Sequence, residues 1–258
     1  MVGDGSTVAL DAQVNIEQRT VPTRDAVSPL YTFEEWMRRV KPAEPCRIEE
    51  KLNGLWLLSD PGNLRGYVDG WLFYTENNGS ARHLALVSDV GVQAPIHDIR
   101  AHVFQIANKS VYPITHGYKR YEEILDDYAT RVDHVRKVTT GIKDIRYALV
   151  SAHRSSNNSW QVDGGVSGSQ PVFLIAPGGE ATPLYQDAIK ESVHTVPFHQ
   201  DNIPPGSRIV LLSHGVQSHR KELIDSILQG KPPISPTGAF GPGPMIPDDR
   251  TVAVLRLD

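Results

Sequence analysis

Four aspartates stand beside apolar runs of the sequence, at places where strands are expected to begin or end. Asp69 lies within one such run, Asp89 closes another, and the adjacent Asp248 and Asp249 open the last one. Carboxylate oxygens are the ligands that hard cations such as magnesium and manganese prefer. These aspartates therefore predict a divalent-cation site, provided that the fold brings them together.

A purely structural role is the alternative for each of these aspartates. An aspartate at a strand end is commonly a turn residue, because its short side chain hydrogen-bonds the local backbone.

Sequence motifs for other kinds of catalytic or cofactor-binding site are missing. The sequence has no phosphate-binding glycine loop, no dinucleotide fingerprint after a strand, no His-Glu-x-x-His helix and no Gly-x-Ser-x-Gly elbow.

The elements that must position the aspartates are mostly strands. Turn formers at 60–63 and 77–79 separate alternating runs, which predicts an antiparallel meander before the first long helix. The predicted strands cover residues 55–58, 66–74, 83–88, 144–153, 160–162, 171–176, 208–213 and 251–257.

Two helices are expected between these groups of strands. Apolar residues recur at helical spacing over 96–106 and again over 121–135. Weaker patterns predict a short helix from Thr32 to Val40, another over 223–228, and a strand within 8–16. Strands, helices and more strands in this order indicate helices packed on a sheet or on a pair of sheets.

Composition narrows the class of protein. The 258 residues are 40% hydrophobic and carry a net charge of −4, which suits one globular domain and argues against nucleic acid as the main partner. The lone Cys46 cannot form an internal disulfide and fits a reducing compartment. Neither a signal peptide nor an apolar run long enough to span a membrane is visible, so we expect a cytoplasmic protein without a membrane partner.

The order of these segments resembles the metal-dependent protein phosphatases (the PPM superfamily), and within it the branch of the sporulation stage II protein E phosphatase. Residues 203–216 look like the branch's Pro-Gly-Asp, apolar strand and Ser-Asp-Gly-Val. Residues 248–255 are similar to its terminal Asp-Asp-x-Thr strand, and 161–184 to its glycine-bearing hairpin. Residues 86–90 and Asp69 match the family's first half more loosely, and the resemblance covers roughly 60–258.

The resemblance implies an α+β fold in which two antiparallel sheets pack face to face, with helices outside and a two-metal site at one end. Carried onto this chain, Asp89 would bridge the manganese or magnesium ions, with the Val90 carbonyl beside it. Asp248, with its neighbour Asp249, would bind one metal, and Asp69 would bind through water. A metal-activated water would then hydrolyse the phosphoester, without a side-chain nucleophile.

Two departures from the family pattern concern this site. His214 stands where the family has an aspartate, and 91–94 replace its Gly-His-Gly. An imidazole suits softer metals than magnesium, so His214 is either a ligand or a hydrogen-bonded loop histidine.

Three functions follow from these patterns. The first is a phosphatase acting on phosphoserine or phosphothreonine of a protein in signalling, which makes an enzyme the favoured assignment. The second is a catalytically impaired pseudophosphatase that binds a regulatory protein partner, and the third is a structural component using the Pro/Gly-rich loop 230–247. We further expect 1–59 to be an extension with a strand and a short helix packing on the core, and 60–258 to form the sandwich domain.

Overall fold

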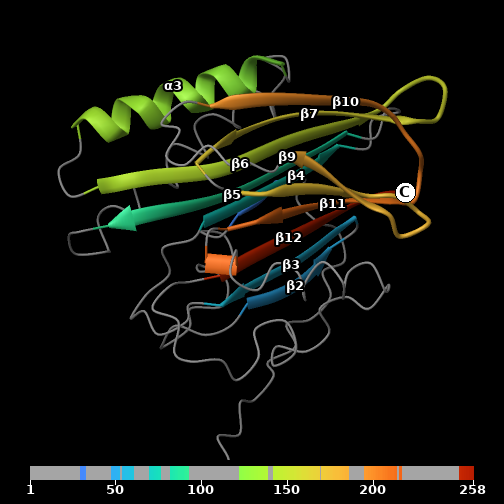
Figure 1. Cartoon of the computed structure of the whole chain (residues 1–258), viewed down its shortest axis with the longest axis horizontal. Helices are drawn as coiled ribbons and strands as arrows, with labels where there is room; N and C mark the ends of the chain where they lie inside the picture. Colours follow the sequence, from blue (N-terminus) through green and yellow to red (C-terminus); the bar gives the residue numbers. More distant parts are fainter. Residues whose placement is uncertain are drawn as a thin grey trace, which may run out of the picture.

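Two antiparallel β-sheets packed face to face form the body of the protein (Figure 1). They are seen in a computed structural model. It describes residues 30–32, 48–52, 54–60, 70–76, 82–92, 122–138, 142–168, 170–185, 195–213, 215–216 and 250–258.

The first sheet, sheet A, contains six strands, and each pairs antiparallel with its neighbour. Its two longest strands, β5 and β6, lie side by side in the middle and form its longest pairing. In spatial order the strands are β1 (Leu30–Thr32), β4 (Gly70–Glu76), β5 (Arg82–Val92), β6 (Ile142–Arg154), β7 (Trp160–Ser167) and β10 (Val196–Ile203).

The second sheet, sheet B, also has six antiparallel strands, and β12 lies in its interior between β3 and β11. Strands β11 and β12 pack across the sandwich against β5 of sheet A. In spatial order the strands are β2 (Ile48–Leu52), β3 (Leu55–Asp60), β12 (Arg250–Leu257), β11 (Ser207–Leu212), β8 (Val172–Ile175) and β9 (Ala181–Tyr185).

Alternation along the strands separates the core from the outer faces. On β5, Ala85 and Val87 belong to the core between the sheets, whereas Leu84 and Leu86 point to the other side of sheet A. The two faces of sheet B divide in the same way, with Leu211 in the inter-sheet core and Val210 in a separate outer cluster. Strands β5 and β11 are therefore apolar and buried on both sides.

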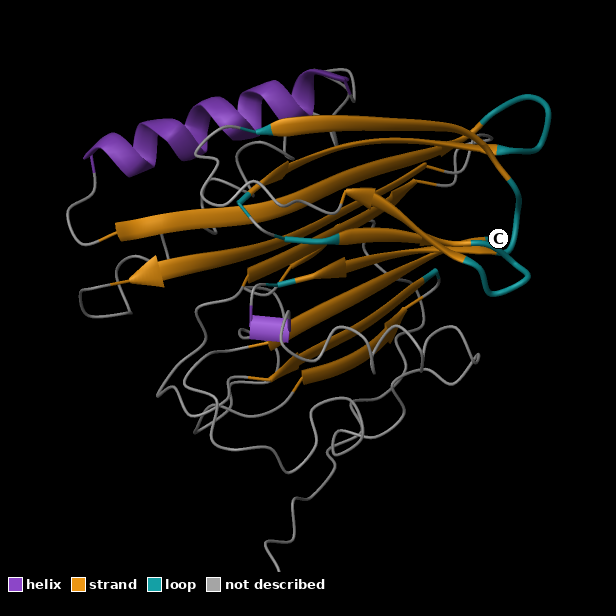
Figure 2. Ribbon diagram, viewed as in Figure 1, coloured by secondary structure: helices purple, strands orange, loops and turns teal. Residues whose placement is uncertain are grey.

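One helix, α3 (Glu122–Val138), lies along the outer face of sheet A, as Figure 2 shows. Its buried residues recur at helical spacing, and Tyr128 meets Tyr147 of β6 edge to face with ring centroids 4.7 Å apart. Two basic residues, Arg136 and Lys137, occupy the last turn, where positive charge suits the helix dipole. The buried positions are Ile124, Tyr128, Val132 and Val135.

The predicted fold class, an antiparallel β-sandwich of two sheets with helix packed outside, is confirmed. Strands β1, β2, β9 and β10 were not predicted from the sequence. Thr32, where the predicted short helix to Val40 begins, is instead the last residue of β1. The rest of that helix and the predicted elements within 8–16, 96–106 and 223–228 lie outside the described residues. The predicted boundary between an extension, 1–59, and the sandwich domain, 60–258, stays a prediction. Three strands from the predicted extension belong to the sheets: β1 lies in sheet A, and β2 and β3 lie in sheet B.

Candidate functional site

Polar side chains are buried at one end of the sandwich, where β5 and β11 end and β12 begins (Figure 1). A strand end is a natural place for such a group, because the apolar alternation stops there and the chain turns away from the core. The buried polar residues at this end are Ser59, Asp89, Gln170, Ser213 and Thr251.

Asp89 faces the space between the sheets. It lies two residues beyond Val87 on β5 and has the same orientation as the core residues of that strand. Directly opposite on β6 is Arg146, and its Nη1 lies 3.8 Å from Asp89 Oδ2. The Asp89 side chain is 8% exposed and that of Arg146 29% exposed, so the carboxylate is inside the sandwich and its partner side chain is the more accessible of the two. A buried carboxylate requires such a compensating charge or hydrogen-bond donor.

The turn from β7 to β8, which carries the chain from sheet A to sheet B, packs against the stem of Arg146. Gly168 in this turn has φ +80, a conformation that favours glycine. A Cβ atom there would lie 2.7 Å from Cγ of Arg146 and 3.1 Å from its Cβ. The absence of a side chain at Gly168 therefore lets the turn pack directly against the aliphatic stem of the arginine.

Hydroxyl groups hold the end of β11 to the start of β12. Thr251 N donates to Ser213 Oγ at 2.8 Å, and Ser213 N donates to the Thr251 carbonyl at 2.9 Å. The Thr251 hydroxyl also pairs with that of Ser59 on β3 at 2.9 Å, inside the structure. These bonds fix the backbone one residue before His214 and two residues after Asp249 in the sequence.

Gln170 is buried, and its side-chain amide makes no hydrogen bond to the described residues. Both Nε2 and Oε1 are inaccessible to solvent, and neither has a hydrogen-bond partner among the described residues. The next residue, Pro171, accepts a bond from Leu212 N at 3.3 Å, which places Gln170 beside Ser213 across β8 and β11. An unpaired buried polar group costs about 1–3 kcal/mol, so Gln170 is a candidate for contact with a ligand or with a residue outside the described ranges.

The donors at this end suit a hard divalent cation, because the Asp89 carboxylate and the Gln170 amide oxygen are both oxygen ligands. They are only part of a ligand set. Within the described ranges no three His, Cys, Asp or Glu side chains come close enough to hold a metal ion.

The predicted ligands divide into two groups. Asp89 and Val90 are in β5, as expected. Asp69, His214, Asp248 and Asp249 lie outside the described residues, so their convergence on Asp89 stays a prediction. The residue after Asp69, Gly70, pairs with Ser88, the residue before Asp89. Sequence reasoning missed Arg146 and Gln170, and the only signal for the former was a charged residue within a predicted apolar strand.

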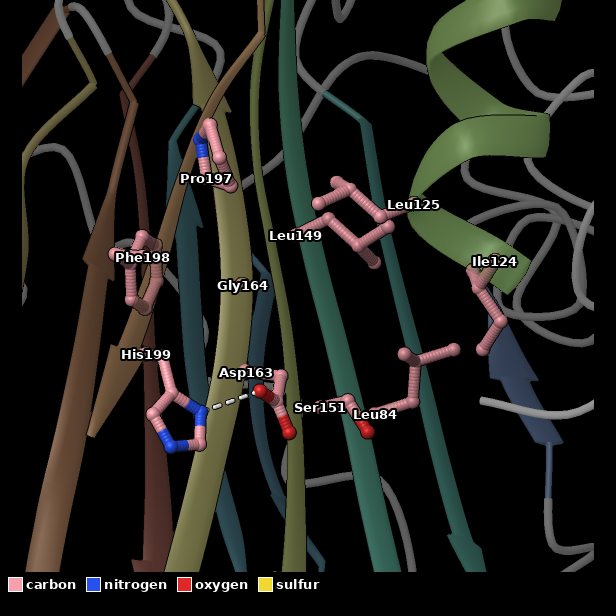
Figure 3. A pocket seen from close by; sticks show the side chains of 10 residues that line it. All are labelled: Leu84, Ile124, Leu125, Leu149, Ser151, Asp163, Gly164, Pro197, Phe198 and His199. Carbon is pink, nitrogen blue, oxygen red and sulfur yellow. Dashed lines mark hydrogen bonds and ion pairs between the residues drawn. The ribbon is translucent and has the colours of Figure 1, made fainter. Parts of the chain in front are cut away.

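A second feature, an open pocket of about 370 Å³, lies on the outer face of sheet A beside the start of α3 (Figure 3). At its polar end the imidazole of His199 lies between two carboxylates, 2.6 Å from Asp163 and 2.8 Å from Asp201. These hydrogen bonds raise the pKa of His199, and the one to Asp163 has the larger effect. The lining residues are Leu84, Ile124, Leu125, Leu149, Ser151, Asp163, Gly164, Pro197, Phe198 and His199.

Comparison with solved structures identifies the class of fold. No protein-family profile matches the chain, and no curated protein sequence matches it. The PPM Ser-Thr phosphatase MsPP from Mycobacterium smegmatis superposes with a TM-score of 0.55 at 14% identity, over 81% of this chain and 100% of that one. The catalytic domain of the serine/threonine phosphatase PstP, in complex with two manganese ions, has a TM-score of 0.53 at 13% identity. The match covers 78% of this chain and 96% of that one.

The predicted branch is also represented among the similar structures. The phosphatase domain of SpoIIE from Bacillus subtilis, with a fragment of its regulatory domain, gives a TM-score of 0.53 at 13% identity, over 83% of this chain and 64% of that one. The chain therefore has the fold of the PPM phosphatases, which confirms the fold that the resemblance implied. In addition, none of the helices in the described part of the chain has the length and apolar character needed to cross a membrane.

Proposed function

We propose that this protein is a metal-dependent phosphatase acting on phosphoserine or phosphothreonine of a protein substrate. The observation that carries the proposal is the buried carboxylate of Asp89 at the end of a sandwich with the PPM phosphatase fold. A carboxylate is unstable in such a place without cations, and it is an unusual residue to keep there for packing alone. The overall acidity of the chain also fits a protein partner better than nucleic acid.

The residues that would hold the metal ions are those that the sequence predicts. Asp89 and the Val90 carbonyl would hold them, together with Asp69, His214 and Asp248 or Asp249. Manganese is the favoured ion, because a site with one imidazole suits it better than magnesium. When bound, the ions would supply an acidified water and neutralise phosphate charge.

The described residues would prepare this site. Burial of Asp89 keeps its charge in a poorly solvated place, where attraction to a cation is stronger than in water. The Ser213 to Thr251 hydrogen bonds fix the strand ends that flank His214 and Asp249. Gln170 would offer its unpaired amide to a ligand at the same end of the sandwich.

A second candidate function is supported by Arg146. Its guanidinium already provides positive charge beside Asp89, as expected of a pseudophosphatase that no longer needs a metal. His214 in place of an acidic ligand agrees with this alternative. Such a protein would keep the sandwich as a surface for binding a regulatory partner in the cytoplasm.

Hydrolysis assays distinguish the two functions. With manganese and either an aryl phosphate or a phosphopeptide, we expect turnover that Asp89→Asn lowers about a hundredfold, equal to about 2.7 kcal/mol in the barrier. Asp163→Asn is the matched control, because Asp163 lies on the outer face of sheet A and is partly exposed. Turnover that survives in Asp89→Asn contradicts the phosphatase proposal. Absence of turnover in the wild-type protein, together with stable folding, favours the pseudophosphatase.

A further inference from the structure

Arg146 and Asp89 form a cross-strand pair that faces the core side of sheet A. The two residues are directly opposite in the register of β5 and β6, and 3.8 Å separates Nη1 from Oδ2. This distance places the charges close together but leaves no room for a metal ion between them, since cation to oxygen distances are about 2.0–2.6 Å. A divalent ion bound to Asp89 would therefore lie next to a guanidinium of the same charge sign.

The β7 to β8 turn packs against the stem of Arg146 and not against its guanidinium. Gly168 lies against the Cβ, Cγ and Cδ atoms on one side, so the stem is held by the β7 to β8 turn. The side chain as a whole is 29% exposed, whereas that of Asp89 is only 8% exposed. A long arginine side chain can keep its stem packed while its head turns out to water. The stem of Arg146 is therefore packed against the turn, and rotation about its outer torsions would move the guanidinium relative to the carboxylate.

We propose that Arg146 is a resident cation that competes with the divalent metal ion for Asp89, so that metal loading requires the guanidinium to turn outward. The residue then sets the metal affinity of the site and keeps the metal-free protein folded by balancing the buried carboxylate. This inference rests on the proposed metal site. It goes further by assigning to Arg146 a function that opposes metal binding.

The test measures manganese binding to the full chain by isothermal titration calorimetry and by the electron paramagnetic resonance signal of free manganese. Arg146→Gln removes the competing charge, and we expect it to bind manganese about tenfold more tightly than the wild-type protein, equal to about 1.4 kcal/mol. Adding Asp89→Asn to Arg146→Gln should abolish this gain. Arg256→Gln is the matched control, because Arg256 is also paired with a carboxylate but lies on β12 away from Asp89, and its affinity should not change.

If circular dichroism shows that Arg146→Gln does not fold, a second variant tests the same inference. Arg146→Lys keeps the charge but has a shorter side chain that places it farther from the carboxylate, and we expect its affinity for manganese to rise about threefold. Equal or weaker binding in the folded Arg146 variant overturns the inference. So does an unchanged manganese affinity accompanied by weaker binding of orthovanadate, because Arg146 would then be a phosphate-binding residue.

The outcomes separate the inference from the proposed function. If the wild-type protein hydrolyses phosphopeptide with manganese and Arg146→Gln binds the ion no better, the inference fails and the proposed function stands. If Arg146→Gln gains manganese binding but neither protein hydrolyses any substrate, the inference stands and the proposed function fails. If neither protein binds manganese, both are wrong.

Discussion

His83 on β5 stacks on the indole of Trp160 on β7, with ring centroids 5.1 Å apart and ring planes 23° apart. The small Ala152, which pairs with His83 on the intervening strand β6, leaves room for the two rings to meet. His83 Nδ1 also hydrogen-bonds the hydroxyl of Thr75 at 2.8 Å. The histidine and Asp89 therefore occupy the two ends of the same strand, and the core lies between them.

The first prediction concerns acid stability. Burial lowers the pKa of His83 to about 4, although the nearby Asp258 carboxylate opposes this effect. The unfolded chain binds the proton near pH 6.5, so the free energy of unfolding should fall as the pH drops from about 6.5 to about 4, by up to about 3 kcal/mol. Urea unfolding at several pH values measures this slope.

The variant His83→Gln isolates the contribution of His83 to the pH dependence of stability. It should be less stable than the wild-type protein at pH 7.5, because it loses the stacking contact. Its loss of stability between pH 6.5 and 4.5 should be smaller than that of the wild-type protein. Parallel pH profiles for the two proteins would contradict the assignment.

The second prediction has the opposite sign and concerns His199. Hydrogen bonds to Asp163 and Asp201 raise the pKa of its imidazole above the usual value. The stabilisation is therefore complete below about pH 6.5 and is lost as the pH rises through the raised folded-state pKa. Because the three side chains are about half exposed, we expect a small effect that high salt weakens.

Thermal unfolding at pH 6 and pH 8.5 in low salt tests the His199 term. Between pH 6 and pH 8.5 the melting temperature of the wild-type protein should fall by more than that of His199→Gln. The difference should shrink in 1 M salt, a condition that screens exposed charges. An equal loss in both proteins at low salt would show that the bridge between β7 and β10 adds nothing measurable.

The third prediction concerns close packing between β7 and its neighbours. A Cβ atom on Gly164 would lie 2.2 Å from the ring of Phe198 and 2.8 Å from the backbone oxygen of Leu149. The ring can shift, but the backbone oxygen belongs to a paired strand, so Gly164→Ala should destabilise the protein by about 1–3 kcal/mol. Gly178→Ala is the matched control, because nothing lies within 4 Å of its Cβ position, and it should be tolerated. Equal chemical-denaturation midpoints for the two variants would refute the prediction.

The fourth prediction concerns the buried hydroxyl pair of Ser59 and Thr251. Thr251→Val keeps the shape of the side chain but leaves the Ser59 hydroxyl without its partner. It should therefore cost about 1–3 kcal/mol in the free energy of unfolding. Combining it with Ser59→Ala removes both polar groups, and the double variant should be more stable than additivity of the single changes predicts. A strictly additive cycle would show that the two hydroxyls do not interact.

Much of the sandwich is predictable from the sequence, because its central strands are long and regular. The run around Leu84 and Val87 alternates cleanly, and α3 has the apolar spacing of a helix with one buried face. Strand β10 was missed because it is an edge strand with a polar, mostly exposed surface that includes Pro197. A proline is tolerated at an edge, where a missing N–H breaks no pairing, but in the sequence it indicates a loop.

The candidate site is less predictable than the fold. Asp89 could be found because it ends an apolar run, and its burial agrees with that position. Arg146 could not, since an arginine within a strand normally faces solvent, and only the register of β5 with β6 brings it opposite Asp89. Gln170 was hidden for a similar reason, because its unpaired amide is a property of the packed structure and not of residue type.

The position of β12 between β3 and β11 affects how fast the chain can fold. Residues Leu55 and Leu255 are paired partners in sheet B, and the Ser59 to Thr251 bond closes a separation of 192 positions. A contact of this range must overcome a large loss of chain entropy before it contributes any energy. The two sides of sheet B therefore remain unjoined until β12 arrives, and refolding should be slow, in the range of milliseconds to seconds that non-local β topologies show.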